Sequence, residues 1–293
     1  MVPRGVAGRR KSRYNPCRRP VGAVERHMKR IVFATGPIAR TPTRRQPRRA
    51  FAQLLSAALG LEVVVVVAST YNELAGLVHR GDAHVAWLPP AVYVRSCQRD
   101  GVQLLLETIR ARGSVFRSAL FVRTDASFQS IEDLAGHAVA WVDQNSCSGY
   151  LFPRISLFDR GVDPRTHFRR ELVLGSHEAV VRAVEVGTAS VGATYIDQVP
   201  GEDARESHPG WTMEVELDEM RPLMVSDPIP ADTISVRPDV PAQVREDLSA
   251  ALLSMHATEE GAEVILGLFG AERFEPGRIE DYEPIRRAIE LSC

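Results

Sequence analysis

Residues 138–152 read Ala-Val-Ala-Trp-Val-Asp-Gln-Asn-Ser-Cys-Ser-Gly-Tyr-Leu-Phe. The apolar run at 138–142 is typical of a buried strand, and the small polar residues after it are typical of a loop that opens a helix. Such a loop gathers unpaired backbone N–H groups and the hydroxyls of Ser146 and Ser148 at the positive end of the helix dipole. This arrangement suits a tetrahedral oxyanion without a Lys or Arg, although an ordinary serine N-cap has the same pattern.

Strands and helices alternate on both sides of this segment. Thr70 and Glu73 form a capping box at the start of one helix, and Gly81 is placed to end it. We expect strands at 31–34, 62–68, 84–88, 102–109, 118–122, 138–142, 170–174 and 190–196, and helices at 47–59, 70–81, 130–136, 178–186, 242–255 and 259–269, with two more opening after 90 and 146. This order predicts an α/β fold with parallel, doubly wound sheets.

The same order of elements predicts two lobes. Lobe 1 would comprise residues 29–122 and 222–293, and lobe 2 residues 123–221, with crossings near 120–124 and 220–225. Two crossings imply a hinge, with a ligand held in the cleft between the lobes and helix N-termini pointing into it. Residues 1–28 form a basic arm that we expect to be disordered, because it lacks apolar periodicity.

Composition limits the classes of function. The chain of 293 residues is 44% hydrophobic, enough for two buried cores, and no apolar stretch approaches the roughly 20 residues of a membrane span. Residues 1–50 hold 15 Lys or Arg against one acid, but no nucleic-acid motif accompanies them, so no nucleic acid is expected as a partner. The cysteines at 17, 97, 147 and 293 lack the spacing of a metal site, and we expect no metal or cofactor.

The first 28 residues do not form a signal peptide. Arginine pairs occur at 9–10 and 18–19, but no apolar segment follows either pair. Met28, which is followed at once by two basic residues and an expected strand, resembles a true translation start. These features predict either a cytoplasmic protein or a start site that misses the export signal.

Four blocks of this sequence resemble the solute-binding proteins of phosphate, phosphite and phosphonate ABC transporters. They follow the order of that family over roughly residues 30–255. The blocks are 71–81, which opens with Tyr-Asn-Glu-Leu, 86–93, Ala-Trp-Leu-Pro-Pro-Ala-Val-Tyr, 131–153, which contains Ser-Cys-Ser-Gly-Tyr, and 175–187, which opens with Gly-Ser-His-Glu. The resemblance implies a two-lobed type 2 periplasmic-binding-protein fold with a hinge and an interlobe ligand cleft.

In that family a serine/threonine loop at a helix N-terminus holds the oxyanion. The residues that match it here are Ser146, Cys147, Ser148 and Gly149. The middle position of the loop is usually Thr or Ser, so Cys147 is a departure. A thiol is a weak donor, and at a helix N-terminus we expect its pKa to fall, which would place a negative charge beside the ligand.

The resemblance also implies ligand contacts from aromatic residues. Two tyrosines that close over the ligand in the family correspond to Tyr71 and Tyr93, and a histidine after a Gly-Ser pair corresponds to His177. Each has an alternative: Tyr71 as a half-buried helix residue, Tyr93 as core, and His177 as a helix cap. If it faces the cleft, His177 adds a donor whose charge titrates near neutral pH.

One acidic residue concerns the organic end of the ligand. Family members that bind aminoalkyl phosphonates use carboxylates downstream of the fourth block, and only Asp197 lies near that place. This sequence therefore disfavours a zwitterionic ligand, and phosphate, phosphite or a simple alkylphosphonate fits it.

The function implied by the resemblance is non-enzymatic binding of a small phosphorus oxyanion. The chain would be a monomeric solute-binding component of an ABC uptake system, periplasmic or at the cell surface, with a permease or a sensor protein as partner. Two alternatives remain open: a cytoplasmic ligand-sensing module, and a dehydratase-like enzyme on the same fold. The enzyme would need an acid or base in the cleft, for which His177 is the main candidate and Asp143 a poorer one, and we assign no catalytic residue.

Overall fold

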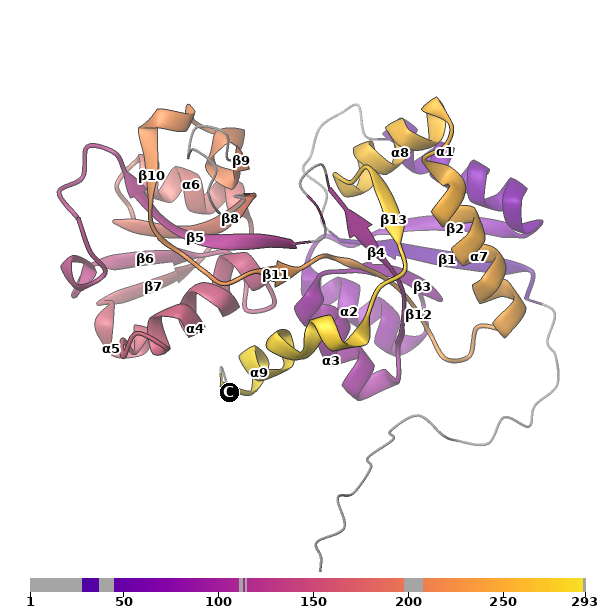
Figure 1. Ribbon diagram of the computed structural model, residues 1–293, viewed down its shortest axis with the longest axis horizontal. Helices are drawn as coiled ribbons and strands as arrows, with labels where there is room; N and C mark the ends of the chain where they lie inside the picture. The colour runs from indigo at the N-terminus through magenta and orange to yellow at the C-terminus, as the bar shows by residue number, and fades with distance from the viewer. Residues whose placement is uncertain (1–27, 37–44, 111–112, 114, 198–207, 292–293) are drawn as a thin grey trace, which may run out of the picture.

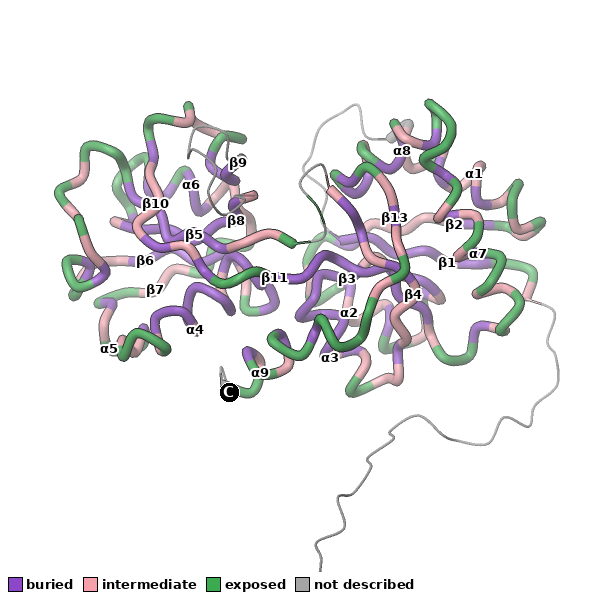
Figure 2. Tube along the Cα trace, in the orientation of Figure 1, coloured by how far each residue is buried: buried purple, intermediate pink, exposed green. Residues whose placement is uncertain are grey.

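The computed structural model describes residues 28–36, 45–110, 113, 115–197 and 208–291. Two β-sheets with helices on their faces form two lobes, connected by extended segments (Figure 1). Buried residues gather around each sheet (Figure 2). Most of the basic arm, residues 1–27, lies outside the described residues.

Lobe 1 is built on a six-stranded sheet in the order β13-β4-β12-β3-β1-β2. Strand β1 is parallel to β2 and β3, whereas β12 is antiparallel to β3 and β4, and β13 is antiparallel to β4. The strands are β1 (Arg30–Thr35), β2 (Glu62–Val67), β3 (Val85–Leu88), β4 (Gln103–Ile109), β12 (Thr233–Val236) and β13 (Arg273–Glu275).

Helices cover both faces of this sheet. On one face, Phe33 packs with Phe51 and Phe269 from two helices, with ring centroids 5.0–6.1 Å apart. The next residue of β1, Ala34, points to the opposite face and belongs to a second cluster. The first face carries α1 (Arg45–Leu59), α7 (Ala242–Met255) and α8 (Glu259–Phe269), and the second carries α2 (Tyr71–Arg80), α3 (Pro90–Asp100) and α9 (Glu283–Leu291).

Lobe 2 is built on a sheet in the order β10-β5-β8-β6-β7, to which β9 and β11 add short pairings. Its strands are β5 (Val115–Arg123), β6 (Ala138–Trp141), β7 (Arg170–Val173), β8 (Val191–Asp197), β9 (His208–Pro209), β10 (Met220–Val225) and β11 (Ile229–Pro230). Its helices are α4 (Phe152–Phe158), α5 (Pro164–His167) and α6 (His177–Glu185). Short helical turns occur at Glu132–Leu134, Cys147–Leu151, Gly210–Met213 and Leu217–Glu219, and in lobe 1 at Ile279–Tyr282.

The crossings between the sheets differ from the expected ones. The strand expected at 118–122 in lobe 1 is part of β5, which pairs with β8 and β10 in the second sheet. The first crossing therefore lies between β4 and β5, and the second lies between β10 and β12. We propose lobe boundaries within 110–115 and 226–232 in place of 122–123 and 221–222.

Both sheets are mixed, whereas parallel sheets were expected. The strands that follow a crossing, β5 and β12, enter their sheets antiparallel to their neighbours. Hydrophobic runs alone could not give this direction, because a buried strand has the same pattern in either orientation.

Two predicted helix starts had different outcomes. The Thr70 hydroxyl accepts the N–H of Glu73 at 3.0 Å, and Gly81 ends that helix in the left-handed conformation, so the predicted start and end are confirmed. The reciprocal bond of the capping box is displaced by one residue, because the Glu73 carboxylate accepts the N–H of Ser69 at 2.6 Å. The helix expected at 130–136 is only a single 3-10 turn. Asp133 accepts the N–H of Ser130, but the cap is followed by one turn before the chain enters β6.

Within the described residues, no helix is both long and apolar enough to cross a bilayer.

The aromatic cluster of lobe 1 supports a stability prediction. Phe51 is fully buried, and replacing it with Ala leaves a cavity between α1, α8 and the sheet. We expect Phe51→Ala to lower the free energy of unfolding by about 3–5 kcal/mol in urea denaturation. Leu266→Ala, on the exposed side of α8, is the control and should change it by less than about 0.5 kcal/mol. Similar losses in the two variants would contradict this packing.

Candidate functional site

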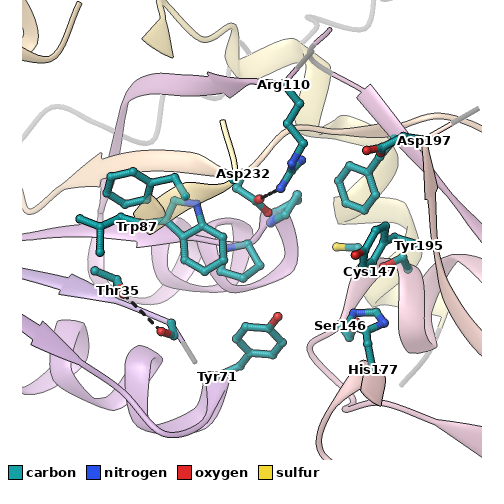
Figure 3. A pocket seen from close by; sticks show the side chains of 18 of the residues that line it. Thr35, Tyr71, Trp87, Arg110, Ser146, Cys147, His177, Tyr195, Asp197 and Asp232 are labelled. Atoms are coloured by element: carbon teal, nitrogen blue, oxygen red, sulfur yellow. Dashed lines mark hydrogen bonds and ion pairs between the residues drawn. The ribbon is translucent and has the colours of Figure 1, made fainter. Parts of the chain in front are cut away.

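A cavity of about 390 Å³ lies between the lobes, and both lobes and both crossings line it (Figure 3). Lobe 1 contributes Thr35, Tyr71 and Trp87, lobe 2 contributes Ser146, Cys147, Ser148 and His177, and the crossings contribute Arg110 and Asp232. The volume falls within the range of cavities that bind small molecules.

The loop after β6 enters the cavity as the sequence predicted. Ser146 is extended, and its hydroxyl accepts the N–H of Gly149 at 3.0 Å. The chain then makes a π-helical turn, Cys147–Leu151, that continues into α4. The Ser146 hydroxyl therefore acts as an N-cap and keeps its own proton for donation.

Gly149 lies behind the loop and is not among the residues that line the cavity. A Cβ atom there would come within 2.3 Å of the Val142 side chain, so only glycine lets the turn approach the preceding strand. The Gly149 carbonyl also accepts the N–H of Val142 at 3.0 Å. Its contribution is to bring the helix start close to the end of β6.

The start of this helix supplies N–H donors. The first N–H groups of a helix have no partner inside it, and here the N–H of Gly149 is used by Ser146. The backbone N–H groups of Cys147 and Ser148 stand at the same end. The Ser118 hydroxyl donates to the Ser148 carbonyl at 2.6 Å, which fixes the turn against β5.

The loop is also attached to lobe 1. The Asn145 amide is buried, donates to Asn72 at 2.8 Å and accepts from Arg95 at 2.9 Å. Asn72 belongs to α2 and Arg95 to α3, so two lobe 1 helices hold the residue just before Ser146.

Of the eight residues predicted at the site, six line the cavity: Tyr71, Ser146, Cys147, Ser148, His177 and Asp197. Tyr93 does not line it. Its side chain is 2% exposed, belongs to the core under α3 and meets the ring of Tyr282 edge-on, with centroids 5.1 Å apart. The structure therefore corrects the placement of Tyr93 at the ligand, because this position of α3 faces the core.

Tyr71 lies in the first turn of α2 and faces the cavity (Figure 3). Burial, with smaller contributions from Asp232 and Cys147, raises the pKa of its hydroxyl well above the ordinary value. The hydroxyl therefore stays protonated and can donate to an anion.

His177 is placed as predicted but does not titrate as predicted. Ser176 caps α6, and the His177 Nδ1 is 2.9 Å from the Thr194 hydroxyl. Burial lowers the pKa of His177 to about 4, with a small opposing effect from Glu178. The expectation of a charge that changes near neutral pH is wrong, and the imidazole is a neutral group there.

The expectation for Cys147 is also wrong. Burial raises the pKa of its thiol to about 12, although a hydrogen bond from the backbone N–H of Ala91 opposes this. Cys147 is 3% exposed and packs against lobe 1. Loss of water at the lobe interface thus outweighs the helix dipole, and the thiol stays neutral.

Arg110 and Asp232 were not found from the sequence. Their side chains form an ion pair of 2.6 Å, and Asp232 is 5% exposed. The pKa of Asp232 is raised by burial, although Arg110 acts to lower it. The pKa of Arg110 is also raised, because Asp232 and Asp197 together outweigh the opposite effect of burial. A solitary Arg and a solitary Asp in two distant segments carry no motif, so only the fold reveals the pair.

Aromatic residues of the cavity were also missed. Trp87, in β3, has an indole N–H that is buried without a hydrogen-bond partner among the described residues. Tyr195, in β8, packs edge-on against His177, with centroids 5.3 Å apart, and its hydroxyl donates to the Met213 sulfur at 3.0 Å. Trp87 stands in the block at 86–93, which was a signal available in the sequence.

No group of three or more His, Cys, Asp or Glu side chains in the described part of the chain is arranged to hold a metal ion.

Comparison with known proteins gives a family match. A family model described as the periplasmic substrate-binding protein of phosphonate ABC transporters matches residues 39–282. The match therefore extends over most of the chain, including the second sheet, every strand of the first sheet except β1, and the loop after β6.

Solved structures with a similar fold include PhnD1 from Prochlorococcus marinus in complex with methylphosphonate, with a TM-score of 0.74, 17% identity, and 90% of this chain and 98% of that chain covered. A binding-protein component of an ABC phosphonate transporter from Pseudomonas aeruginosa has a TM-score of 0.73 and 22% identity, covering 89% and 86%. A Xanthomonas citri protein bound to ATP has a TM-score of 0.72 and 19% identity, covering 90% and 98%. At these identities the likeness establishes the fold.

The lowered pKa of His177 predicts a pH dependence of stability. The unfolded state binds the proton near pH 6.5 and the folded state only near pH 4, so stability is full above about pH 6.5 and falls toward pH 4. The loss is at most roughly 3 kcal/mol, and less because the ring keeps some exposure to water. When the free energy of unfolding is measured in urea at pH 7.5 and at pH 5, it should fall less between the two pH values for His177→Gln than for the wild type. His256→Gln, at an exposed position, should match the wild type, and equal acid losses in all three proteins would contradict the assignment.

The raised pKa of Cys147 predicts an unreactive thiol. At pH 8 its thiolate fraction, and therefore its rate of alkylation by iodoacetamide, should be about a thousandfold below that of a free cysteine. Peptide mass spectrometry of the native protein measures this rate, and the same protein alkylated in urea is the control. Alkylation of native Cys147 at the rate of the unfolded chain would show an exposed, ionisable thiol.

Proposed function

The chain belongs to the family of periplasmic substrate-binding proteins of phosphonate ABC transporters, and from that premise we propose that its 146–149 loop binds the phosphonate group between the lobes. Members of this family bind a solute and are not enzymes. The family therefore favours a binding protein over the sensing module and the dehydratase-like enzyme.

The observation that carries the proposal is a set of neutral donors at one end of the cavity. The hydroxyls of Ser146 and Ser148 and the backbone N–H groups at the start of the π-helical turn come from lobe 2. The hydroxyl of Tyr71 reaches the cavity from lobe 1, and His177 lines it from α6. Tyr71 stays protonated at neutral pH, so lobe closure brings donors from both lobes to one anion.

Neutral donors suit this anion physically. Hydrogen bonds from N–H and O–H groups to a charged oxygen are stronger than those between neutral partners, and a helix N-terminus adds its dipole. Because the donors are held by Gly149 and Ser118, little reorganisation is needed on binding. The anion can therefore be bound without an adjacent cation.

The remaining cavity wall fits an organic substituent. Trp87, Phe116 and Phe269 line it, and apolar side chains would exclude water from a carbon chain. Inorganic phosphate has no apolar group that could pack against this wall, whereas a phosphonate carries a carbon substituent on its phosphorus atom. The methylphosphonate bound by the similar Prochlorococcus marinus protein makes that compound the first ligand to test.

We further propose that the liganded, closed form docks on the permease of an ABC transporter as a monomer, outside the cytoplasm. Membership of a periplasmic family supports this location.

Methylphosphonate binding tests the proposal. Isothermal titration calorimetry should detect binding to the wild type, and Ser148→Ala should weaken it by about 1.5–3 kcal/mol, because one hydrogen bond to a charged group is lost. Ser254→Ala removes an exposed hydroxyl from α7 and should bind as the wild type does. Failure of methylphosphonate, phosphite and phosphate to bind the wild type would refute the proposed function.

A further inference from the structure

Aromatic side chains from both lobes line opposite sides of the cavity. Trp87, in β3, belongs to lobe 1, and Tyr195, in β8, belongs to lobe 2. Figure 3 shows Trp87 on the side of Tyr71 and Tyr195 on the side of His177. Both rings are half-buried, and the part of each that lines the cavity is open to a ligand. Closure of the lobes would bring the two rings toward each other.

Packing fixes the ring on the lobe 1 side. A Cβ atom at Gly36, directly after β1, would come within 2.6 Å of Cζ3 of Trp87, so glycine leaves room for the indole there. Trp87 also packs against the buried residues on both faces of the lobe 1 sheet. The position of the indole is therefore set before a ligand binds.

The ring on the lobe 2 side is fixed as well. A Cβ atom at Gly210 would come within 2.9 Å of Cε1 of Tyr195, so the glycine lies directly against this ring. The Tyr195 hydroxyl donates to the Met213 sulfur at 3.0 Å, and the ring meets His177 edge-on. These contacts hold Tyr195 at the cavity wall.

Flat groups continue the wall beside these two rings. Phe116 from lobe 2 and Phe269 from lobe 1 also line the cavity. The guanidinium of Arg110 lies 5.4 Å from the centre of the Phe116 ring and is paired with Asp232 at 2.6 Å. A guanidinium is planar and stacks on aromatic faces, so this wall suits another flat group.

We propose that the cavity selects phosphonates that carry a planar unsaturated ring, and that the ring lies between Trp87 of lobe 1 and Tyr195 of lobe 2. This inference rests on the proposed function, since the phosphonate group occupies the 146–149 loop. A flat ring presents one face to each lobe, and it has few rotatable bonds to immobilise on closure. A flexible alkyl chain loses rotamer freedom on binding, and a saturated ring is thicker and has no π-face.

Benzylphosphonate and cyclohexylmethylphosphonate form the critical pair, because they differ only in the unsaturation of the ring. In calorimetry of the full chain, the aromatic compound should bind about tenfold more tightly, since aromatic pairs contribute beyond their buried area. The saturated compound has at least as much apolar surface, so burial alone does not favour the aromatic one. Heptylphosphonate, with the same number of carbon atoms in a flexible chain, should also bind more weakly than benzylphosphonate.

Phosphate esters are a second source of the same chemistry. Benzyl phosphate and cyclohexylmethyl phosphate repeat the comparison with an oxygen between the ring and the phosphorus atom. A preference for the aromatic member of either pair supports the ring subsite, and the pair that binds more tightly identifies the source.

Substitutions assign the preference to residues. Trp87→Leu and Tyr195→Leu each keep an apolar side chain but remove one ring, so the affinity ratio of the aromatic to the saturated compound should fall to about threefold in each. In Trp87→Leu/Tyr195→Leu it should fall to near one. Any difference in basicity between the two phosphonates is the same in every variant, so the change in ratio reports the rings alone.

Two further variants are the controls. Trp87→Phe keeps a ring at this position and should retain most of the preference, and with Tyr195→Leu it keeps the test valid if Trp87→Leu does not fold. Phe158→Leu removes a half-buried ring of α4 that is not among the residues lining the cavity, and should retain the full ratio.

The outcomes separate the two levels of the proposal. If methylphosphonate binds and neither aromatic compound exceeds its saturated partner, the ring inference is overturned and the proposed function stands. A wild-type ratio that persists in Trp87→Leu/Tyr195→Leu, or in Trp87→Phe/Tyr195→Leu where the first does not fold, overturns it as well. If no phosphonate binds the wild type, the proposed function itself fails.

Discussion

The close approach of Gly149 to Val142 is the constraint on which the site depends. A Cβ at position 149 would overlap the valine side chain, so glycine alone allows a helix to start directly against the end of β6. This start places Ser146, Cys147 and Ser148 just beyond the carboxyl end of β6. The first N–H groups of a helix have no partners within the helix, so they are available there. The loop is then fixed to β5 and to lobe 1, so its donors are already oriented before a ligand arrives. Their geometry follows from backbone packing, and the side chains add to it.

Burial decides the charge of the groups around the loop. Desolvation lowers the pKa of His177 and raises those of Cys147 and Tyr71, so all three are neutral near pH 7. A charged imidazole would attract an oxyanion more strongly, but its formation in this cavity would cost more than it does in water. The loop end of the cavity therefore relies on hydrogen-bond donors. At the hinge end, the charges of Arg110 and Asp232 compensate each other.

The hinge pair connects the architecture to recognition. The two crossings come from segments more than a hundred residues apart, and each contributes one member of the pair. An isolated Arg or Asp at this depth would be unfavourable, so the pair makes burial of either charge tolerable. The same pair lines the cavity, and the hinge is therefore a part of the binding surface as well as the connection between the lobes.

The sequence by itself determined the α/β class, the two-lobed organisation and the loop, because strand and helix patterns, the Thr70 cap and the serines around Cys147 are local features. It did not determine which sheet β5 joins, because β5 pairs with strands that are distant in the sequence. A buried strand also has the same hydrophobic pattern in a parallel and in an antiparallel pairing. It also gave the wrong ionisation for His177 and Cys147 and the wrong surroundings for Tyr93. The two ionisations depend on how much water the packed elements exclude, and the surroundings of Tyr93 depend on which side of α3 faces the core. Only the tertiary structure brought Arg110 to Asp232, because their contact requires both crossings to pass the same point. Two single residues so far apart in the sequence form no local pattern that could predict this contact.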